Sequence, residues 1–211
     1  LRSDADIILD VSTQKSCSAT LKHAVKYHIP YVMGTTGLSD ECKKALLAAS
    51  EKIPILVASN FSKGIALLTQ LCQQAAKSDF ASNDFEVEII EKHHHHKKDV
   101  PSGTALSLAQ AINESSSQKH SLVMGRTPES PLWSPKEIAI HSVRAGKIFG
   151  EHEVLWVSEH ESISLSHSAL SRHCLADGAL HACLFISHQK AGMYCMQDSL
   201  KQKQPLLNTC T

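Results

Sequence analysis

The sequence lacks any hydrophobic run long enough to cross a membrane. Its longest apolar stretches, 53–58 and 182–186, fall far short of the roughly 18 to 20 residues that a membrane-spanning helix needs. It also lacks the basic and then apolar layout of a signal peptide, and it does not begin with methionine. We therefore expect a processed, cut or incomplete chain without a membrane-spanning segment.

A net charge and a cysteine framework are missing as well. The 21 basic residues balance the 21 acidic ones, so no overall field favours nucleic acid or an anionic membrane surface. The seven cysteines are odd in number, scattered, and never spaced as C-x-x-C. This usage is typical of a protein in the reducing cytoplasm, where we expect this chain, and we interpret the cysteines as buried free thiols.

Short apolar runs alternate with helix-like segments in the first part of the chain. The runs 6–11, 31–33 and 53–58 are continuous rather than alternating, as expected of strands that are buried on both faces. Between them, 17–28 has helical spacing, and Ser39 can cap a second helix that runs toward Lys52. The pattern predicts a parallel sheet with right-handed crossovers.

The pattern changes after a further predicted helix at 63–78. Residues 86–91 alternate polar and apolar side chains, which indicates a half-exposed strand. Later strands, predicted at 137–144, 154–158 and 162–168, follow with little helix between them, so they should form a mixed or antiparallel sheet. We place a domain boundary near Phe61 and expect a helix at 175–187 to return to the first lobe.

The segment 91–105, EKHHHHKKDVPSGTA, carries the most chemical information. Asp99, Pro101 and Ser102 are typical of a helix start, so the backbone N–H groups near Gly103 and Thr104 should be available to an anion. Repulsion among the crowded histidines and lysines favours release of a proton near neutral pH. A proton donor beside an anion pocket indicates catalysis.

The histidine run could also be an expression tag, a metal cluster or a solvated loop. A tag is disfavoured because the run is internal and flanked by structured segments. Four consecutive side chains project in different directions, and no cysteine or carboxylate stands at a standard ligand spacing, so we predict no metal site. An inert, solvated loop remains an alternative.

The pattern E-x-H-H-x-H-K-x-D-x-P-S-G-T-A resembles the signature of the dihydrodipicolinate reductase family. Further segments match that family in order and rough spacing: 34–37, 58–62, 143–146, 150–152 and 171–172. The resemblance implies NADH- or NADPH-dependent reduction of a cyclic dihydrodipicolinate-type imine to tetrahydrodipicolinate, in lysine and diaminopimelate biosynthesis. It also implies a small-molecule dicarboxylate substrate and a homotetramer, while the balanced charge predicts no nucleic-acid partner.

The resemblance also implies roles for individual residues. His93 would be the proton donor, and Lys97 would assist it and bind the substrate. His94 would contact one substrate carboxylate, and Gly103 and Thr104 would hold the other. The implied cofactor contacts are Gly34, Thr35, Thr36, Ala58, Ser59, Asn60 and Phe61.

The fold that the resemblance implies is α/β. Residues 1–61 and 172–211 would form an incomplete, Rossmann-like parallel-sheet lobe that binds the dinucleotide. Residues 62–171 would form an α+β lobe with a mixed sheet for substrate binding and oligomerisation. Arg144 and Arg172 are plausible carboxylate or structural partners, but a surface salt bridge is the commoner role of a lone arginine, so we leave both out of the site.

One departure from the family keeps two further hypotheses open. No glycine-rich turn, which would hold the cofactor pyrophosphate, precedes Asp6, so we expect the first cofactor-binding segment to be missing. The chain could then be a non-catalytic remnant that acts as a dicarboxylate-binding or oligomerising module. A histidine-loop metal carrier is the third hypothesis.

Overall fold

The computed structural model describes residues 2–78, 85–128, 130, 134 and 136–201. The chain forms two compact units. Unit 1 consists of Leu1–Ala66 and Leu175–Thr211, and unit 2 of Leu67–Cys174. The C-terminal segment 202–211, with Cys210, lies outside the described residues.

Unit 1 is built on a sheet of four parallel strands. In spatial order they are β1 (Ile8–Asp10), β2 (Tyr31–Met33), β3 (Pro54–Val57) and β9 (Gly192–Tyr194). The first three correspond to the continuous apolar runs, so the prediction of a parallel sheet is confirmed. The chain reaches β9 only after passing through unit 2.

Helices cover both faces of this sheet, and alternate strand residues pack against each layer. Tyr31, Met33 and Ile55 share one hydrophobic cluster with residues of α1 (Gln14–Tyr27) and α2 (Asp40–Ser50). The other cluster joins Val32 and Leu56 to residues of α5 (His173–Ile186) and α6 (Met196–Lys201). Burial on both sides explains why these strands have no polar alternation.

Two glycines in unit 1 lie where a side chain would not fit. A Cβ on Gly178 of α5 would lie 1.7 Å from the carbonyl oxygen of Phe61, and one on Gly34 would lie 2.5 Å from Cε2 of the Phe61 ring. The segment that follows β3 is therefore packed against both α5 and the turn after β2.

Unit 2 contains a five-stranded mixed sheet. Its spatial order is β5 (Ser121–Met124), β6 (Glu137–Arg144), β4 (Glu86–His93), β7 (Glu151–Val157) and β8 (Ser162–Ser168). Strand β6 is parallel to both β5 and β4, whereas β7 is antiparallel to β4 and β8. The predicted mixed sheet is confirmed.

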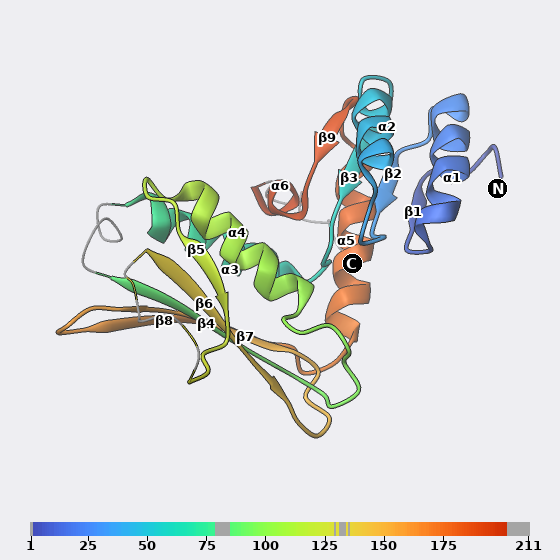
Figure 1. Cartoon of the computed structure of the whole chain (residues 1–211). Coiled ribbons are helices and arrows are strands. Elements are labelled where there is room, and N and C mark those ends of the chain that lie inside the picture. The colour runs from blue at the N-terminus through green and yellow to red at the C-terminus, as the bar shows by residue number, and fades with distance from the viewer. Residues whose placement is uncertain (1, 79–84, 129, 131–133, 135, 202–211) are drawn as a thin grey trace, which may run out of the picture. The chain divides into compact units, whose positions relative to one another are not determined.

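One face of the mixed sheet is covered by helices. Figure 1 shows α3 (Lys63–Lys77) and α4 (Gly103–Ser115) on the same side of it. Accordingly Val87 and Ile89 of β4 are buried, whereas the residue that follows each of them, Glu88 and Ile90, is only partly buried. None of the described helices is long and apolar enough to span a membrane.

Candidate active site

Strand pairing in unit 2 gathers four polar side chains at one end of the mixed sheet. Glu91 and His93 are two residues apart on β4 and therefore face the same side. Arg144 of β6 is the register partner of His93, and His152 of β7 is the partner of Glu91. Residues distant in sequence thus meet on the face of the sheet that the helices cover.

The carboxylate of Glu91 is the centre of this cluster, and it is 0% exposed. Its Oε2 lies 2.5 Å from Nδ1 of His93. Arg144 donates from Nη1 to Oε2 at 2.9 Å and from Nη2 to Oε1 at 2.7 Å. The backbone N–H of Ser102 donates to Oε1 at 3.1 Å, so both carboxylate oxygens are held by two N–H groups each.

These contacts fix the charge of Glu91. Burial alone would raise the pKa of Glu91, but hydrogen bonds from Arg144, His93 and the Ser102 N–H outweigh it and lower the pKa to about 2. An ionised carboxylate only accepts hydrogen bonds. Nδ1 of His93 must therefore carry a proton and donate a hydrogen bond to Glu91.

His93 is itself nearly buried, with 7% of its surface exposed. Burial lowers the pKa of His93, and the positive charges of Lys97 and Arg144 act in the same direction against the effect of Glu91. A Cβ on Gly150 would lie 3.0 Å from Nε2 of His93. The absence of a side chain at this glycine leaves space beside the second ring nitrogen.

A second buried imidazole, that of His152, contacts the ring of His93. The rings of His93 and His152 make an edge contact with centroids 5.2 Å apart, and Nε2 of His152 lies 3.1 Å from the Ser102 hydroxyl. Nδ1 of His152 has no hydrogen-bond partner among the described residues. Burial and the neighbouring His93 lower the pKa of His152 to about 3.

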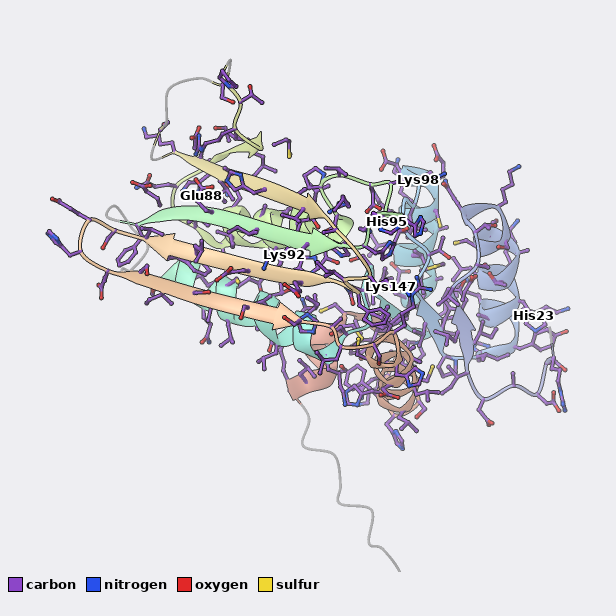
Figure 2. The ribbon with its side chains drawn as sticks, turned by 90° about the horizontal axis from the view of Figure 1, so that it is seen from below. His23, Glu88, Lys92, His95, Lys98 and Lys147 are labelled. Carbon is purple, nitrogen blue, oxygen red and sulfur yellow. The ribbon has the colours of Figure 1, made fainter. Side chains whose placement is uncertain are left out.

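The basic loop begins where β4 ends. Figure 2 labels Glu88 and Lys92 along the strand, and His95 and Lys98 on the loop beyond it. Nζ of Lys97 lies 2.8 Å from Oδ2 of Asp99. Nδ1 of His94 is buried without a hydrogen-bond partner among the described residues, as expected of a group that would bind a ligand.

The loop leads into the N-terminus of α4, as the sequence predicted. Ser102 caps the helix, its hydroxyl accepting from the N–H of Ala105 at 3.2 Å. A Cβ on Gly103 would meet nothing within 4 Å, so the space next to it is open. The pKa of Asp99 is lowered, first by Lys97 and also by the backbone of Gly103. A carboxylate of the chain itself therefore lies beside the predicted anion site.

The predicted cofactor residues lie in unit 1, at the carboxyl ends of β2 and β3. Gly34, Thr35 and Thr36 follow β2, and the segment 58–61 follows β3, where dinucleotides bind to parallel sheets. The Thr35 hydroxyl oxygen is buried and has no hydrogen-bond partner among the described residues. The Ala58 N–H donates to the carbonyl of Met33 at 2.9 Å, tying both segments together. An unsatisfied hydroxyl at this edge fits a bound nicotinamide cofactor.

Three residues of this cluster, Glu91, Arg144 and His152, were given no role from the sequence, and the expected surface position of Arg144 was wrong. Glu91 was part of the quoted motif but received no role, although its spacing from His93 places both on one strand face. Arg144 was expected to form a surface salt bridge, but its side chain is only 16% exposed and pairs with buried Glu91. Only the register of β4 and β6 brings these residues together.

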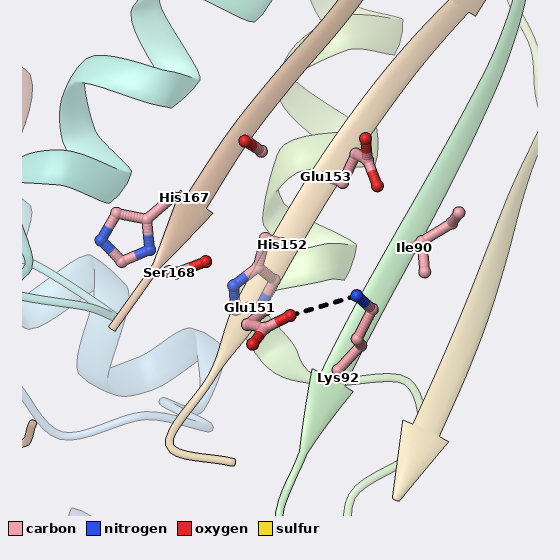
Figure 3. A pocket seen from close by; sticks show the side chains of 8 residues that line it. Ile90, Lys92, Glu151, His152, Glu153, His167 and Ser168 are labelled. Atoms are coloured by element: carbon pink, nitrogen blue, oxygen red, sulfur yellow. Dashed lines mark ion pairs between the residues drawn. The ribbon is translucent and has the colours of Figure 1, made fainter. Parts of the chain in front are cut away.

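A second, polar hollow lies on the strands β4, β7 and β8. Figure 3 shows Lys92 and Glu151 paired across it, with Nζ and Oε2 3.1 Å apart. Its lining residues are Ile90, Lys92, Glu151, His152, Glu153, Ser166, His167 and Ser168. Neither His93 nor Lys97 lines it. Within the described part of the chain, no group of three His, Cys, Asp or Glu residues is placed to hold a metal ion.

Two family models match nearly the whole chain. The model "Dihydrodipicolinate reductase, N-terminus" matches residues 1–61, and "Dihydrodipicolinate reductase, C-terminus" matches 64–200. The chain belongs to the dihydrodipicolinate reductase family. This family uses NADH or NADPH, and its N-terminal domain binds the nucleotide.

Individual relatives agree with this assignment. The 4-hydroxy-tetrahydrodipicolinate reductase of Caldanaerobacter subterraneus subsp. tengcongensis is 44% identical over 202 residues, which cover 96% of this chain and 79% of the relative. The enzyme of the same name from Campylobacter concisus is 40% identical, with 92% and 76% covered. The dipicolinate-bound dihydrodipicolinate reductase of Paenisporosarcina sp. TG-14 has a TM-score of 0.74 at 28% identity, with 92% and 73% covered.

Proposed function

We propose that this member of the dihydrodipicolinate reductase family catalyses NAD(P)H-dependent reduction of a cyclic dihydrodipicolinate-type imine to tetrahydrodipicolinate, in lysine and diaminopimelate biosynthesis. The observation that carries this proposal is the placement of His93. Its Nδ1 is held by buried Glu91, and it stands at the start of the loop that contains His94 and Lys97 and leads into α4. A fixed imidazole beside cationic groups is suited to protonating a dianionic substrate.

The residues of this loop have distinct proposed tasks. Bound NADH or NADPH supplies a hydride. His93 donates the proton that the reduced substrate then requires at carbon, and Lys97 assists this transfer and binds the substrate. The partly buried position of Lys97 next to His93 supports this pairing, since its charge acts on the imidazole.

The two substrate carboxylates have separate proposed partners. His94 contacts one of them, which would satisfy its buried Nδ1. Gly103 and Thr104, in the first turn of α4, hold the other, since helix N-termini favour anions. The dipicolinate bound to the Paenisporosarcina enzyme is a dicarboxylate of this type.

The cofactor contacts are proposed at the carboxyl edge of the parallel sheet. They comprise Gly34, Thr35, Thr36, Ala58, Ser59, Asn60 and Phe61. The match of residues 1–61 to the N-terminal family model supports this position. We accordingly assign 1–61 and 172–211 to dinucleotide binding and 62–171 to substrate binding and oligomerisation.

We also propose a cytoplasmic homotetramer that assembles through the mixed sheet. The partly exposed side chains of β4 on the face opposite to α4 support this assignment, because an uncovered sheet face that carries apolar residues such as Ile90 can pack against another copy. Size-exclusion chromatography with light scattering would test it. A monomer at micromolar concentration would contradict the proposed assembly.

The alternative, a non-catalytic remnant, is not favoured. The family match includes both the nucleotide-binding and the C-terminal domain models, and the proposed proton donor is already held in place by Glu91. The metal-carrier hypothesis has no matching cluster in the described residues.

Titration of the chain with NADH tests the function most directly. NADH fluorescence should report binding that is strengthened by pyridine-2,6-dicarboxylate, and NADH should be oxidised when the imine substrate is supplied. If pyridine-2,6-dicarboxylate does not strengthen NADH binding, and neither NADH nor NADPH is oxidised, the proposed activity is contradicted and the non-catalytic remnant is favoured.

A further inference from the structure

We infer that Glu91 is a positioning residue for the proton transfer, holding His93 with Nδ1 protonated and Nε2 as the reactive nitrogen, while Arg144 holds Glu91 in place. This inference deepens the proposed function and rests on it. It assigns a role in catalysis to the buried ion pair of Glu91 and Arg144, which would otherwise be only structural.

Hydrogen bonds connect His93 to Glu91 and Glu91 to Arg144. Oε2 of Glu91 lies 2.5 Å from Nδ1 of His93 and accepts from Nη1 of Arg144 at 2.9 Å. None of the described residues donates to or accepts from Nε2 of His93 in a hydrogen bond. The two ring nitrogens therefore have different environments, one fixed and one available.

Arg144 also connects this pair to the substrate loop. Its Nη2 donates to Oε1 of Glu91 at 2.7 Å and to the carbonyl oxygen of Asp99 at 2.6 Å, and its Nη1 donates to the carbonyl of Val143 at 2.8 Å. A planar guanidinium with these acceptors has little freedom to rotate. The loop backbone at Asp99 and the orientation of His93 are thus held by one side chain.

The proton balance explains why a carboxylate is needed at this position. When His93 acts as the acid, its Nε2–H bond breaks, a C–H bond forms on the substrate, and the electron pair stays on Nε2. Nδ1 keeps its proton and its bond to Glu91 throughout. The negative charge of Glu91 stabilises the imidazolium before the transfer, opposing the burial and the nearby cations that disfavour it.

Glu91→Gln removes this charge with little change in shape, and Glu88→Gln is its matched control. Glu88 lies on the same strand but on the other face, and it also binds an arginine, Arg126, at 3.0 Å and a histidine, His141, at 2.6 Å. We expect Glu91→Gln to lower kcat at least about tenfold with NADH affinity unchanged. Glu88→Gln should leave kcat within about twofold.

The pH profile and a double-mutant cycle distinguish positioning from general support of the fold. Loss of the carboxylate charge disfavours protonated His93, so the alkaline limb of kcat should move to lower pH by about one unit. In a His93→Ala background, Glu91→Gln should have no further effect on kcat. An equal loss in both backgrounds, or an unmoved pH limb, would overturn the inference.

Nitrogen-15 NMR of the histidine rings in the unmodified chain gives a test that does not depend on the Glu91 variants folding. The ring resonances of His93, assigned by their absence in His93→Asn, should show the neutral Nδ1–H tautomer. If an active chain shows the Nε2–H tautomer, the inferred role of Glu91 is overturned, but the proposed function is not. Absence of reductase turnover in the unmodified chain would instead contradict the proposed function, and the catalytic role of Glu91 with it.

Discussion

Nε2 of His152 lies 3.1 Å from the hydroxyl oxygen of Ser102, and the imidazole is 4% exposed. In the folded protein, burial and the nearby His93 lower the pKa of His152 to about 3, from an ordinary value of 6.5. Below pH 6.5 the unfolded chain therefore binds a proton at this residue that the folded chain does not. By linkage, His152 favours folding fully above pH 6.5 and less as the pH falls toward 3.

The free energy of unfolding should therefore fall by up to about 1.4 kcal/mol per pH unit on account of His152 as the pH drops below 6.5. Urea denaturation at several pH values between 7.5 and 5 measures this slope. His152→Gln should reduce it, and His160→Gln, at an exposed histidine, should not. His93, His120 and His167, whose pKa values are also lowered, contribute in the same sense, so a residual slope is expected. An unchanged slope in His152→Gln would contradict the prediction.

His93→Ala and Lys97→Ala should each lower kcat at least about 10²-fold while changing NADH affinity little. The reason is that both groups act on the substrate and lie on the loop after β4, whereas the proposed cofactor contacts follow β2 and β3. His95→Ala and Lys98→Ala, at exposed positions of the same loop, are the matched controls and should stay near the unmodified rate. Near-normal turnover in His93→Ala or in Lys97→Ala would remove that residue from the mechanism.

Local sequence patterns predicted most of the fold, because a strand buried on both faces is continuously apolar and a strand with one covered face alternates polar and apolar residues. The continuous apolar run at 31–33 became a fully buried strand, and the alternation at 86–91 became a strand with one covered face. Strands β5 and β9 were not predicted. They are three or four residues long and largely exposed or half-buried, so they carry neither pattern, and only pairing with β6 and β3 defines them.

The site was predictable only where it is contiguous in sequence. His93, His94, Lys97, Gly103 and Thr104 lie in one motif that could be interpreted as a unit. Arg144 and His152 reach the same place through strand register, which sequence spacing does not encode. A lone arginine was therefore assigned to the surface, although its actual partner is a fully buried carboxylate.

Asp99→Asn should lower the KM for the dicarboxylate substrate by about two- to fivefold. Asp99 pairs with Lys97 at 2.8 Å and lies near the Gly103 backbone, so it competes with a substrate carboxylate for both. The pair is partly exposed, which limits the effect. Steady-state kinetics at fixed, saturating NADH measures it, and Asp40→Asn, which breaks an exposed lysine pair in α2, is the control. A raised KM would show that Asp99 positions Lys97 instead.

Gly150→Ala should lower kcat about tenfold without loss of NADH binding. The added Cβ would lie 3.0 Å from Nε2 of His93, so the ring must shift or the substrate must retreat, and small displacements of a proton donor are costly. Gly125→Ala also places a side chain at a positive φ but meets nothing within 4 Å. If both variants lose activity equally, backbone strain rather than crowding of His93 is the cause.

Gly178→Ala should destabilise unit 1 and weaken NADH binding together. Its Cβ would lie 1.7 Å from the carbonyl oxygen of Phe61, a backbone atom that cannot rotate away, so α5 must separate from the segment that follows β3. Overpacking of this kind costs about 3 kcal/mol, measured by thermal unfolding. The atoms nearest to a Cβ on Gly192 belong to the Tyr194 side chain, at 3.3 Å, and that side chain can move, so Gly192→Ala should cost under about 1 kcal/mol. Because the proposed cofactor contacts include 58–61, a destabilised Gly178→Ala with unaltered NADH affinity would show that this segment does not bind the cofactor.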